Sequence, residues 1–361
     1  MWKEAINAVK ESDEKWLIEN NPDFPAFFKS ENLKGKGQLN SNALEAHYRA
    51  GLFKMFLSKK YNGLELPLYE GSKWIENASY LDGNWGWLLG IGVGGAYFAD
   101  YLKPEVSEKY FSPPEALIAG SGKPDGDAVK NANNLWEVSG SWRYCSGSEQ
   151  ASMFTAVTRR EQEILAFVLP IDKAEIRRDW NKIGMQLTCS HSIVAKKAQI
   201  PSENFFNLSQ SSRISSYPLA TYPFLLFARA CFVPVILGIS KSFWQTVSEL
   251  LENNKEKWQQ FQPGRYEFIL KKKKSFLSGH SHLSSLFYKS LKKSWKNHLG
   301  EKKILEKEVS KIGLELAERH YLSCAGILPK LGMEVLEKDH PLQEKWQNLQ
   351  TAYQHMSFQE Y

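Results

Sequence analysis

The sequence is poor in cysteine, and its four cysteines stand far apart. Among its 361 residues there is no Cys-X-X-Cys pair and no cysteine–histidine spacing typical of a zinc site. A disulfide framework and a structural metal are therefore not expected. The histidines also lack ligand spacing with a carboxylate partner, so no metal site is predicted. This cysteine usage is typical of a reducing compartment, and we expect a cytoplasmic protein.

Long hydrophobic runs are also missing. The most apolar stretch, residues 230–239, is ten residues long and contains Pro234. A membrane-spanning helix needs about 20 apolar residues, so no membrane span is predicted. The chain opens with Met1, Trp2 and Lys3, without a basic stub and an apolar run, and we expect no secretory signal.

Basic residues are concentrated in one block. Residues 265–303 hold eleven Lys or Arg against two Glu, whereas the whole chain has a formal net charge of +6. Such a block is typical of a solvated helix face with a lysine-rich loop, or of a rim that attracts a phosphorylated ligand. No nucleic-acid recognition motif accompanies it, so nucleic-acid binding is not expected.

The order of predicted elements is helical, then β, then helical. Leu44, Tyr48 and Leu52 show the three- to four-residue spacing that predicts helices up to about residue 112. Pro113 and Pro114 end that texture, because proline cannot continue a helix. The next ninety residues are rich in Gly, Ser, Thr and β-branched residues. Strands are predicted over residues 135–139, 153–158, 164–169 and 192–200.

Helices return after a polar loop that runs to residue 216. They are predicted over residues 227–251, 284–297, 304–328 and 341–358, the number that an antiparallel bundle needs. The fold class is therefore α+β and mostly α. We expect an N-terminal helical domain (1–112), a small β-barrel or sandwich (113–210) and a C-terminal four-helix bundle (211–361).

Residues at the junctions of these domains form recurring motifs. Residues 51–67 turn from a helix into a glycine loop, and residues 82–87 begin the next helix with Trp87. In the middle of the chain a glycine is followed four residues later by an aromatic and six residues later by a hydroxyl. These are Gly140, Tyr144 and Ser146. A second segment, residues 180–190, contains Thr188 and Ser190 and runs into a strand. Near the end, residues 341–343 read Pro-Leu-Gln and precede Trp346 and His355.

Taken together, these motifs resemble the acyl-CoA dehydrogenase superfamily across nearly the whole chain. The last segment is most similar to the two-component flavin-dependent monooxygenases, which take reduced flavin from a partner reductase. The resemblance implies FAD or FMN as cofactor, a homodimer or homotetramer, and a small-molecule substrate, for which a CoA thioester is one candidate. It implies a flavin reductase as partner, and neither nucleic acid nor membrane.

The resemblance also suggests which residues form the site. His355 and Ser146 are the expected catalytic residues. The residues expected to bind the flavin are Trp142, Tyr144, Ser146, Gly147, Thr188 and Ser190. A hydroxyl and a backbone N–H at a strand end are suitable donors to a flavin edge where charge develops. Trp87 is a further candidate to line the site.

Two alternatives remain open. A dehydrogenase removes a proton next to the thioester with a carboxylate, but Tyr353 is followed by Gln354, and an amide cannot serve as that base. A divergent paralogue without catalysis is the other alternative, because relatives commonly carry arginine and aspartate at positions 344–348. Cys189 also stands where the family usually has glycine, which affects how closely the backbone can approach a cofactor.

Overall fold

The computed structural model describes residues 41–131, 133–160, 163–207 and 217–358. The first part contains the helices α4 (Ser41–Arg49), α5 (Leu68–Leu81), α6 (Gly83–Gly94) and α7 (Pro104–Phe111). Part of the predicted first domain, residues 1–40, lies outside the described residues.

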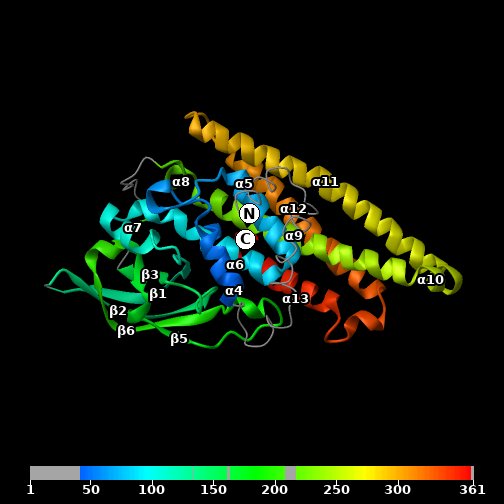
Figure 1. Cartoon of the computed structure of the whole chain (residues 1–361), viewed down its shortest axis with the longest axis horizontal. Helices are drawn as coiled ribbons and strands as arrows, with labels where there is room; N and C mark the ends of the chain where they lie inside the picture. The colour runs from blue at the N-terminus through cyan, green and yellow to red at the C-terminus, as the bar shows by residue number, and fades with distance from the viewer. Residues whose placement is uncertain (1–40, 132, 161–162, 208–216, 359–361) are drawn as a thin grey trace.

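Helix α6 is the central element of this part. It begins as the sequence predicts, because the Asp82 carboxylate accepts a hydrogen bond from the backbone N–H of Trp85 at 2.9 Å. Trp85 and Leu89 are fully buried, and apolar residues occupy every side of the helix. The helix contacts helices α5 and α9 and also strand β1. It therefore lies between the helices and the sheet (Figure 1).

The middle of the chain folds into one mixed sheet of seven strands. They are β1 (Ile118–Lys130), β2 (Leu135–Cys145), β3 (Met153–Arg160), β4 (Glu163–Pro170), β5 (Glu175–Arg177), β6 (His191–Pro201) and β7 (Phe205–Phe206), in the spatial order β5-β6-β2-β1-β3-β4-β7. β1 and β3 are parallel, and the other neighbours are antiparallel. The four predicted strands are all present.

Strand β1 was not among the strands predicted from the sequence. Its residues 120–126 include three glycines and Pro124. They belong to a thirteen-residue strand whose register with β3 shifts on both sides of Pro124. Proline lacks the N–H that a regular ladder needs, so the strand continues with an irregularity at that point. The glycine and proline content of this segment concealed the strand.

The C-terminal part is again helical. It consists of α8 (Pro218–Thr221), α9 (Phe224–Asn253), α10 (Lys255–Phe261), α11 (Pro263–Leu299), α12 (Glu306–Ile327) and α13 (Pro341–Tyr353). Helix α9 is long and apolar enough to cross a membrane by composition, but 78% of its most apolar window is buried inside the protein. It is therefore the core helix of the bundle, against which α5, α12 and α13 pack.

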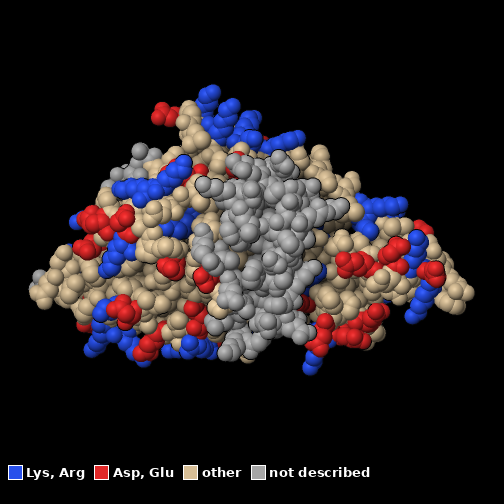
Figure 2. All heavy atoms as spheres, viewed as in Figure 1, with Lys and Arg blue, Asp and Glu red and all other residues tan. Residues whose placement is uncertain are grey.

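Helix α11 corrects one expectation. The basic block was expected to contain a lysine-rich loop, but the lysines of residues 271–274 lie within this one 37-residue helix. Figure 1 shows α11 along the edge of the molecule that faces away from the sheet. Lys292, Lys293 and Lys296 near its end are exposed, and Figure 2 shows basic side chains gathered at this end of the helix. The basic block is thus largely a solvated helix face.

The division into three domains stays a prediction. Along the chain, helices give way to strands between Phe111 and Ile118, and strands give way to helices between Phe206 and Pro218. The overall class, α+β and mostly α with a helical C-terminal part, is as expected.

Candidate functional site

The turn after β2 brings Ser146 against helix α6. Ser146 is 5% exposed, and its Oγ accepts a hydrogen bond from Nε1–H of Trp87 at 3.0 Å. The next residue, Gly147, has φ +82°, a backbone conformation that L side chains rarely adopt. Its N–H donates to the carbonyl of Thr188 at 2.7 Å, which joins this turn to a second one.

The second turn supplies two more hydroxyl groups. Thr188 and Ser190 are both buried, and their Oγ atoms lie 2.7 Å apart. Ser190 Oγ also lies 2.7 Å from Ser146 Oγ. The three hydroxyls therefore form a continuous buried chain that begins at the indole of Trp87.

Cys189 adopts a backbone conformation that favours glycine. Its φ of 45° and ψ of 48° are left-handed, and its backbone carbonyl accepts a hydrogen bond from Ser148 Oγ at 2.6 Å. Burial raises the pKa of its thiol.

His355 reaches the same region from the end of helix α13. Its ring lies 5.3 Å from the ring of Trp87, edge to face, and 4.5 Å from the ring of Phe232 on α9. Its Nδ1 accepts a hydrogen bond from the backbone N–H of Ser357 at 3.3 Å. Nδ1 also lies 2.9 Å from Ser357 Oγ, a contact whose donor depends on the tautomer of the ring. In the tautomer that accepts the Ser357 N–H at Nδ1, the proton is on Nε2 and that nitrogen is a hydrogen-bond donor.

A close approach of backbone holds α13 against the sheet. A Cβ added to Gly184 would lie 2.1 Å from the carbonyl oxygen of Gln347, so only glycine fits there. The side-chain carbonyl of Asn348 accepts a hydrogen bond from the N–H of Met185 at 2.6 Å. Both contacts fix the turn that carries Thr188 and Ser190 relative to the helix that carries His355.

Two further polar side chains complete this framework. The amide oxygen of Asn84, on α6, accepts from the N–H of Leu187 at 3.1 Å. The ammonium of Lys345, on α13, donates to the carbonyl of Ser242 at 3.2 Å and to Thr246 Oγ1 at 2.6 Å, both on α9. Asn348 thus connects α13 to the turn at Met185, and Lys345 connects α13 to α9.

The structure brings most of the expected site residues together, and it leaves two of them apart. Tyr144 is 54% exposed, its ring lies edge-on to Trp180, and the guanidinium of Arg143 lies 4.9 Å from the centre of the ring. Trp142 is fully buried, which corrects its expected role in lining the site. Its indole N–H donates to the carbonyl of Val157 at 2.8 Å, and its ring packs edge-to-face against Phe167.

Two glycines explain why Trp142 turns into the sheet. Gly126 and Gly140 are cross-strand partners, and a Cβ on either would lie within 3 Å of the Trp142 ring. Because these two glycines have no Cβ, the indole of Trp142 fits over them. Gly140 therefore has a packing role in strand β2. Trp142 therefore stabilises the strand that presents Tyr144 and Ser146.

Phe232 and the framework amides were not foreseen from the sequence. Phe232 lies in the apolar stretch of α9, where spacing predicts burial but not which buried ring meets the site. Asn84 and Asn348 carried no signal beyond being polar residues within helical segments. Their hydrogen bonds to Leu187 and Met185 join segments that are far apart in the sequence, so they are visible only in three dimensions.

A second buried polar cluster lies elsewhere in the bundle. His280 Nδ1 on α11 is 2.7 Å from His320 Nε2 on α12, and His280 Nε2 is 3.9 Å from the Glu76 carboxylate on α5. His320 Nδ1 donates to the carbonyl of Leu316, which ends the chain of contacts. Burial lowers the pKa of His280 to about 4 and that of His320 to about 3, so both are neutral packing residues.

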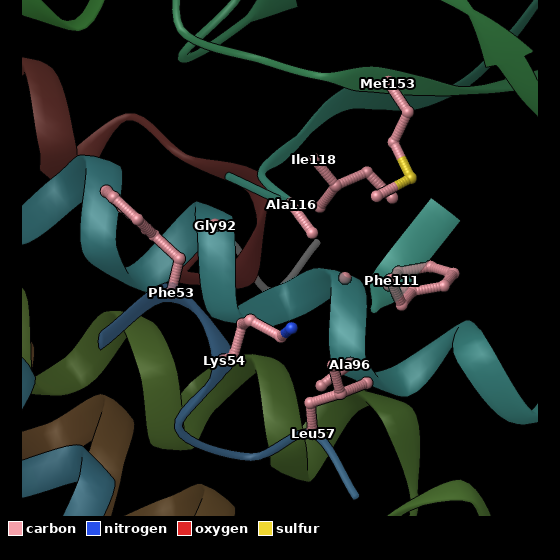
Figure 3. A pocket seen from close by; sticks show the side chains of 10 residues that line it. Phe53, Lys54, Leu57, Gly92, Ala96, Phe111, Ala116, Ile118 and Met153 are labelled. Carbon is pink, nitrogen blue, oxygen red and sulfur yellow. The ribbon is translucent and has the colours of Figure 1, made fainter. Parts of the chain in front are cut away.

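A small surface hollow lies apart from the candidate site (Figure 3). Ten residues line it, including Phe53, Lys54 and Met153, and none of them is an expected site residue. It offers about the room of one water molecule. The ammonium of Lys54 donates to the carbonyls of Ser112 and Pro113 at 2.9 and 3.2 Å, so it caps the end of α7. Among the residues that the structure describes, no group of three possible metal ligands occurs.

Acidification is expected to weaken the fold through His355. Burial lowers its pKa from 6.5 to about 4. The unfolded chain therefore binds a proton at this histidine near pH 6.5, whereas the folded protein binds it only near pH 4. The free energy of unfolding should therefore fall as the pH drops through this window, by up to about 1.4 kcal/mol per pH unit from this group. His355→Gln lacks this proton uptake. Urea unfolding of both proteins at pH 7 and pH 5 measures the effect. Between pH 7 and pH 5 the wild type should lose more free energy of unfolding than His355→Gln, and an equal loss in both proteins would contradict the buried, neutral state of His355.

Comparison with known proteins places this geometry in context. No family model matches the sequence. Indole-3-acetate monooxygenase from Pseudomonas putida is 26% identical over 209 residues, which are 56% of this chain and 53% of that protein. The chain thus spans about half the length of the curated relatives that it matches first.

Solved structures match over nearly the whole chain. The HsaA monooxygenase from M. tuberculosis superposes with a TM-score of 0.83 at 16% identity, over 99% of this chain and 94% of that one. Butyryl-CoA dehydrogenase from Megasphaera elsdenii superposes with a TM-score of 0.73 at 14% identity, over 94% and 93%. Proteins of two different chemistries therefore share one architecture with this chain.

Proposed function

We propose, for a chain that has the acyl-CoA dehydrogenase-like fold, that it is the oxygenase component of a two-component flavin-dependent monooxygenase. It would use reduced FAD or FMN and O₂ to oxygenate a small organic substrate, with the reduced flavin supplied by a separate flavin reductase. The match to indole-3-acetate monooxygenase over half the chain supports this branch of the fold.

One observation carries the proposal, namely that Trp87 joins Ser146 to His355. These three residues come from α6, from the turn after β2 and from the end of α13, and they meet in one buried place. A protein that kept the fold without binding a cofactor would not need a neutral histidine beside a chain of buried hydroxyls. The arrangement fits the edge of a flavin ring, which presents both donors and acceptors.

The residues of this chain have separable tasks around such a cofactor. A bound reduced flavin would supply the electrons for the reaction with O₂. The exposed ring of Tyr144 would support one part of it, and Ser146, Thr188 and Ser190 would bind its polar edge. His355 would donate its Nε2 proton in a hydrogen bond to oxygen or substrate, and the rings of Trp87 and Phe232 would exclude water.

The rings around His355 favour an aromatic substrate. Trp87 and Phe232 lie 5.1 Å apart, and both contact the imidazole, so the site is lined by aromatic faces and edges. We take a small aromatic acid such as indole-3-acetate as the first candidate, because of the named relative. A CoA thioester is the second.

The dehydrogenase alternative has less support from this chain. Gln354 occupies the expected position of a base, its amide cannot accept the proton, and its side chain is exposed while His355 turns inward. The alternative of a paralogue without catalysis predicts a protein that binds no flavin. A homodimer or homotetramer and a cytoplasmic location stay predictions.

Anaerobic titration tests the proposal. The purified protein is mixed with photoreduced FAD and, separately, with reduced FMN, and binding is followed by absorbance and fluorescence. We expect one of the reduced flavins to bind with a dissociation constant in the micromolar range. If neither reduced flavin binds at a concentration about ten times above this micromolar range, the alternative of a paralogue without catalysis replaces the proposal.

A further inference from the structure

The buried histidine pair in the bundle has tautomers that its partners fix. Both rings are neutral because burial lowers their pKa values, and a neutral imidazole has one N–H. His320 Nδ1 lies 2.7 Å from the carbonyl oxygen of Leu316, and a carbonyl can only accept, so this nitrogen carries the proton. His320 Nε2 is then an acceptor, and His280 Nδ1, at 2.7 Å, must donate to it. The other nitrogen of His280, Nε2, is left with a bare lone pair.

This bare nitrogen of His280 faces a buried carboxyl group. Glu76 Oε1 on α5 lies 3.9 Å from it, and Glu76 is only 7% exposed. The other carboxyl oxygen, Oε2, accepts a hydrogen bond from the hydroxyl of Tyr288 on α11. If Glu76 were ionised, a carboxylate oxygen and a nitrogen lone pair would face each other in a buried place with no proton between them, which is costly. One proton on Oε1 removes this conflict, because a carboxylic acid directs an O–H at the imidazole.

The charged groups around Glu76 act in both directions. Burial is the largest influence on the pKa of this carboxyl, and it raises that pKa. Lys241 on α9, the hydrogen bond from Tyr288 and Lys73 on α5 lower it, but they do not reverse the shift. Burial acts on His280 in the opposite sense, since it disfavours the imidazolium. Of the two groups that could hold the proton, the carboxyl is therefore favoured.

We infer that Glu76 is a protonated carboxylic acid in the folded protein at neutral pH, and that its proton makes the contact of α5 with α11 sensitive to pH. These two helices pack together although they are far apart in the sequence (Figure 1). A further contact between them also involves a charge, because the Lys292 ammonium on α11 lies 4.7 Å from the centre of the Tyr69 ring on α5. As the pH rises and Glu76 ionises, the contact between the first helical part and the C-terminal helices weakens.

Nitrogen NMR tests the tautomers on which the proton of Glu76 depends. In protein labelled with ¹⁵N-histidine, the signal of each ring nitrogen shows whether that nitrogen carries a proton. We expect His280 and His320 both to carry it on Nδ1 at pH 7, with each signal assigned by the His→Gln variant that removes it. A proton on Nε2 of His280 would allow an ionised Glu76 to accept from the imidazole, and would overturn the inference.

Infrared spectroscopy at pH 7 detects the proton itself. A protonated carboxyl absorbs at a higher wavenumber than carboxylates and amides do, so its band is resolved from theirs. The wild type should show such a band, and Glu76→Gln should lose it. Glu70→Gln is the matched control and should keep it, because Glu70 lies on the same helix and accepts from the Tyr69 hydroxyl at 3.0 Å, apart from the histidine pair. A wild-type spectrum identical to that of Glu76→Gln in this region would show an ionised Glu76 and overturn the inference.

Urea unfolding at several pH values measures the energetic effect. The unfolded chain loses the Glu76 proton near pH 4.5, whereas the folded protein keeps it to higher pH because its pKa is raised. The stability that this proton contributes is therefore present at low pH and is lost as the pH rises. In Glu76→Gln the amide can accept from Tyr288 and donate to His280 at every pH, so the variant lacks this dependence.

The quantity to compare is the ratio of the unfolding equilibrium constants, wild type over Glu76→Gln. It should rise by about tenfold per pH unit between pH 5 and pH 7, the change that one proton bound only by the folded state produces. The acid effect expected from His355 is the same in both proteins and cancels. A ratio that stays constant would overturn the inference. If Glu76→Gln does not fold, the histidine spectra of the protein still decide.

Discussion

His355→Ala is expected to slow substrate oxygenation by about a hundredfold or more, the usual effect of losing a hydrogen-bonding acid–base group at a reacting centre. The imidazole is neutral, and its Nε2 proton is the only donor that the ring offers, because Nδ1 accepts from Ser357. Helix α13 should remain, since Leu342, Leu349 and Ala352 hold it by burial. The measurement is kcat with a saturating supply of reduced flavin.

The adjacent residue provides the control for this variant. Gln354→Glu changes an exposed side chain and should keep wild-type kcat within about twofold, as is usual for exposed positions. His355→Gln retains an N–H donor and should recover part of the lost rate. Equal kcat in wild type and His355→Ala would show that the imidazole takes no part in the reaction.

Gly184→Ala is expected to destabilise the protein by about 3 kcal/mol, at the upper end of overpacking effects. The added Cβ would meet the Gln347 carbonyl carbon and oxygen and the Asn348 nitrogen, all within 2.7 Å. These are backbone atoms of a helix, so they cannot move aside as a flexible side chain would. The turn and α13 must separate, and the Asn348–Met185 hydrogen bond should be lost with them.

Gly326→Ala is the matched control for this prediction. Gly326 lies within α12, and a Cβ there would meet no atom within 4 Å. Alanine should raise stability by about 0.5–1 kcal/mol, because it lowers the entropy of the unfolded chain. Denaturant unfolding of both variants compares the two effects directly, and a Gly184→Ala protein as stable as wild type would contradict the close contact.

The sequence predicted the broad architecture because helical spacing and proline breaks are local signals. Helical spacing located the stretch around Leu44, Tyr48 and Leu52, and the content of β-branched and turn residues located the strands beginning at Leu135 and Met153. Strand β1 was missed because its glycines and Pro124 read locally as a loop. The extended ladder with β3 overrides that propensity, and it depends on residues more than thirty positions away.

Within the site, motif spacing located Ser146 and His355 but could not place Trp142. Trp142 and Tyr144 on β2 and Ser146 just after it are alternate residues, which a regular strand would put on one face. The positive φ of Tyr144 breaks that alternation, and the glycines opposite Trp142 draw its ring into the sheet. Neither feature is visible without the partner strand.

The contact between α13 and the turn at Gly184 lies beyond sequence reasoning for the same reason. A lone glycine after Ile183 marks a turn in any chain, and only the approach of Gln347 shows why no other residue fits. The chain of buried hydroxyls is also invisible in the sequence, because it joins α6 to two separate turns through contacts of Trp87, Ser146 and Ser190.

Isotope labelling with ¹⁸O₂ tests the central claim most directly. The protein is loaded anaerobically with reduced flavin, mixed with indole-3-acetate or related aromatic acids in ¹⁸O₂-saturated buffer, and the products are weighed by mass spectrometry. The monooxygenase account predicts a product that carries one ¹⁸O atom per molecule, strongly diminished in His355→Ala. A protein that instead forms an α,β-unsaturated acyl thioester with an artificial electron acceptor, equally in wild type and in His355→Ala, would contradict it.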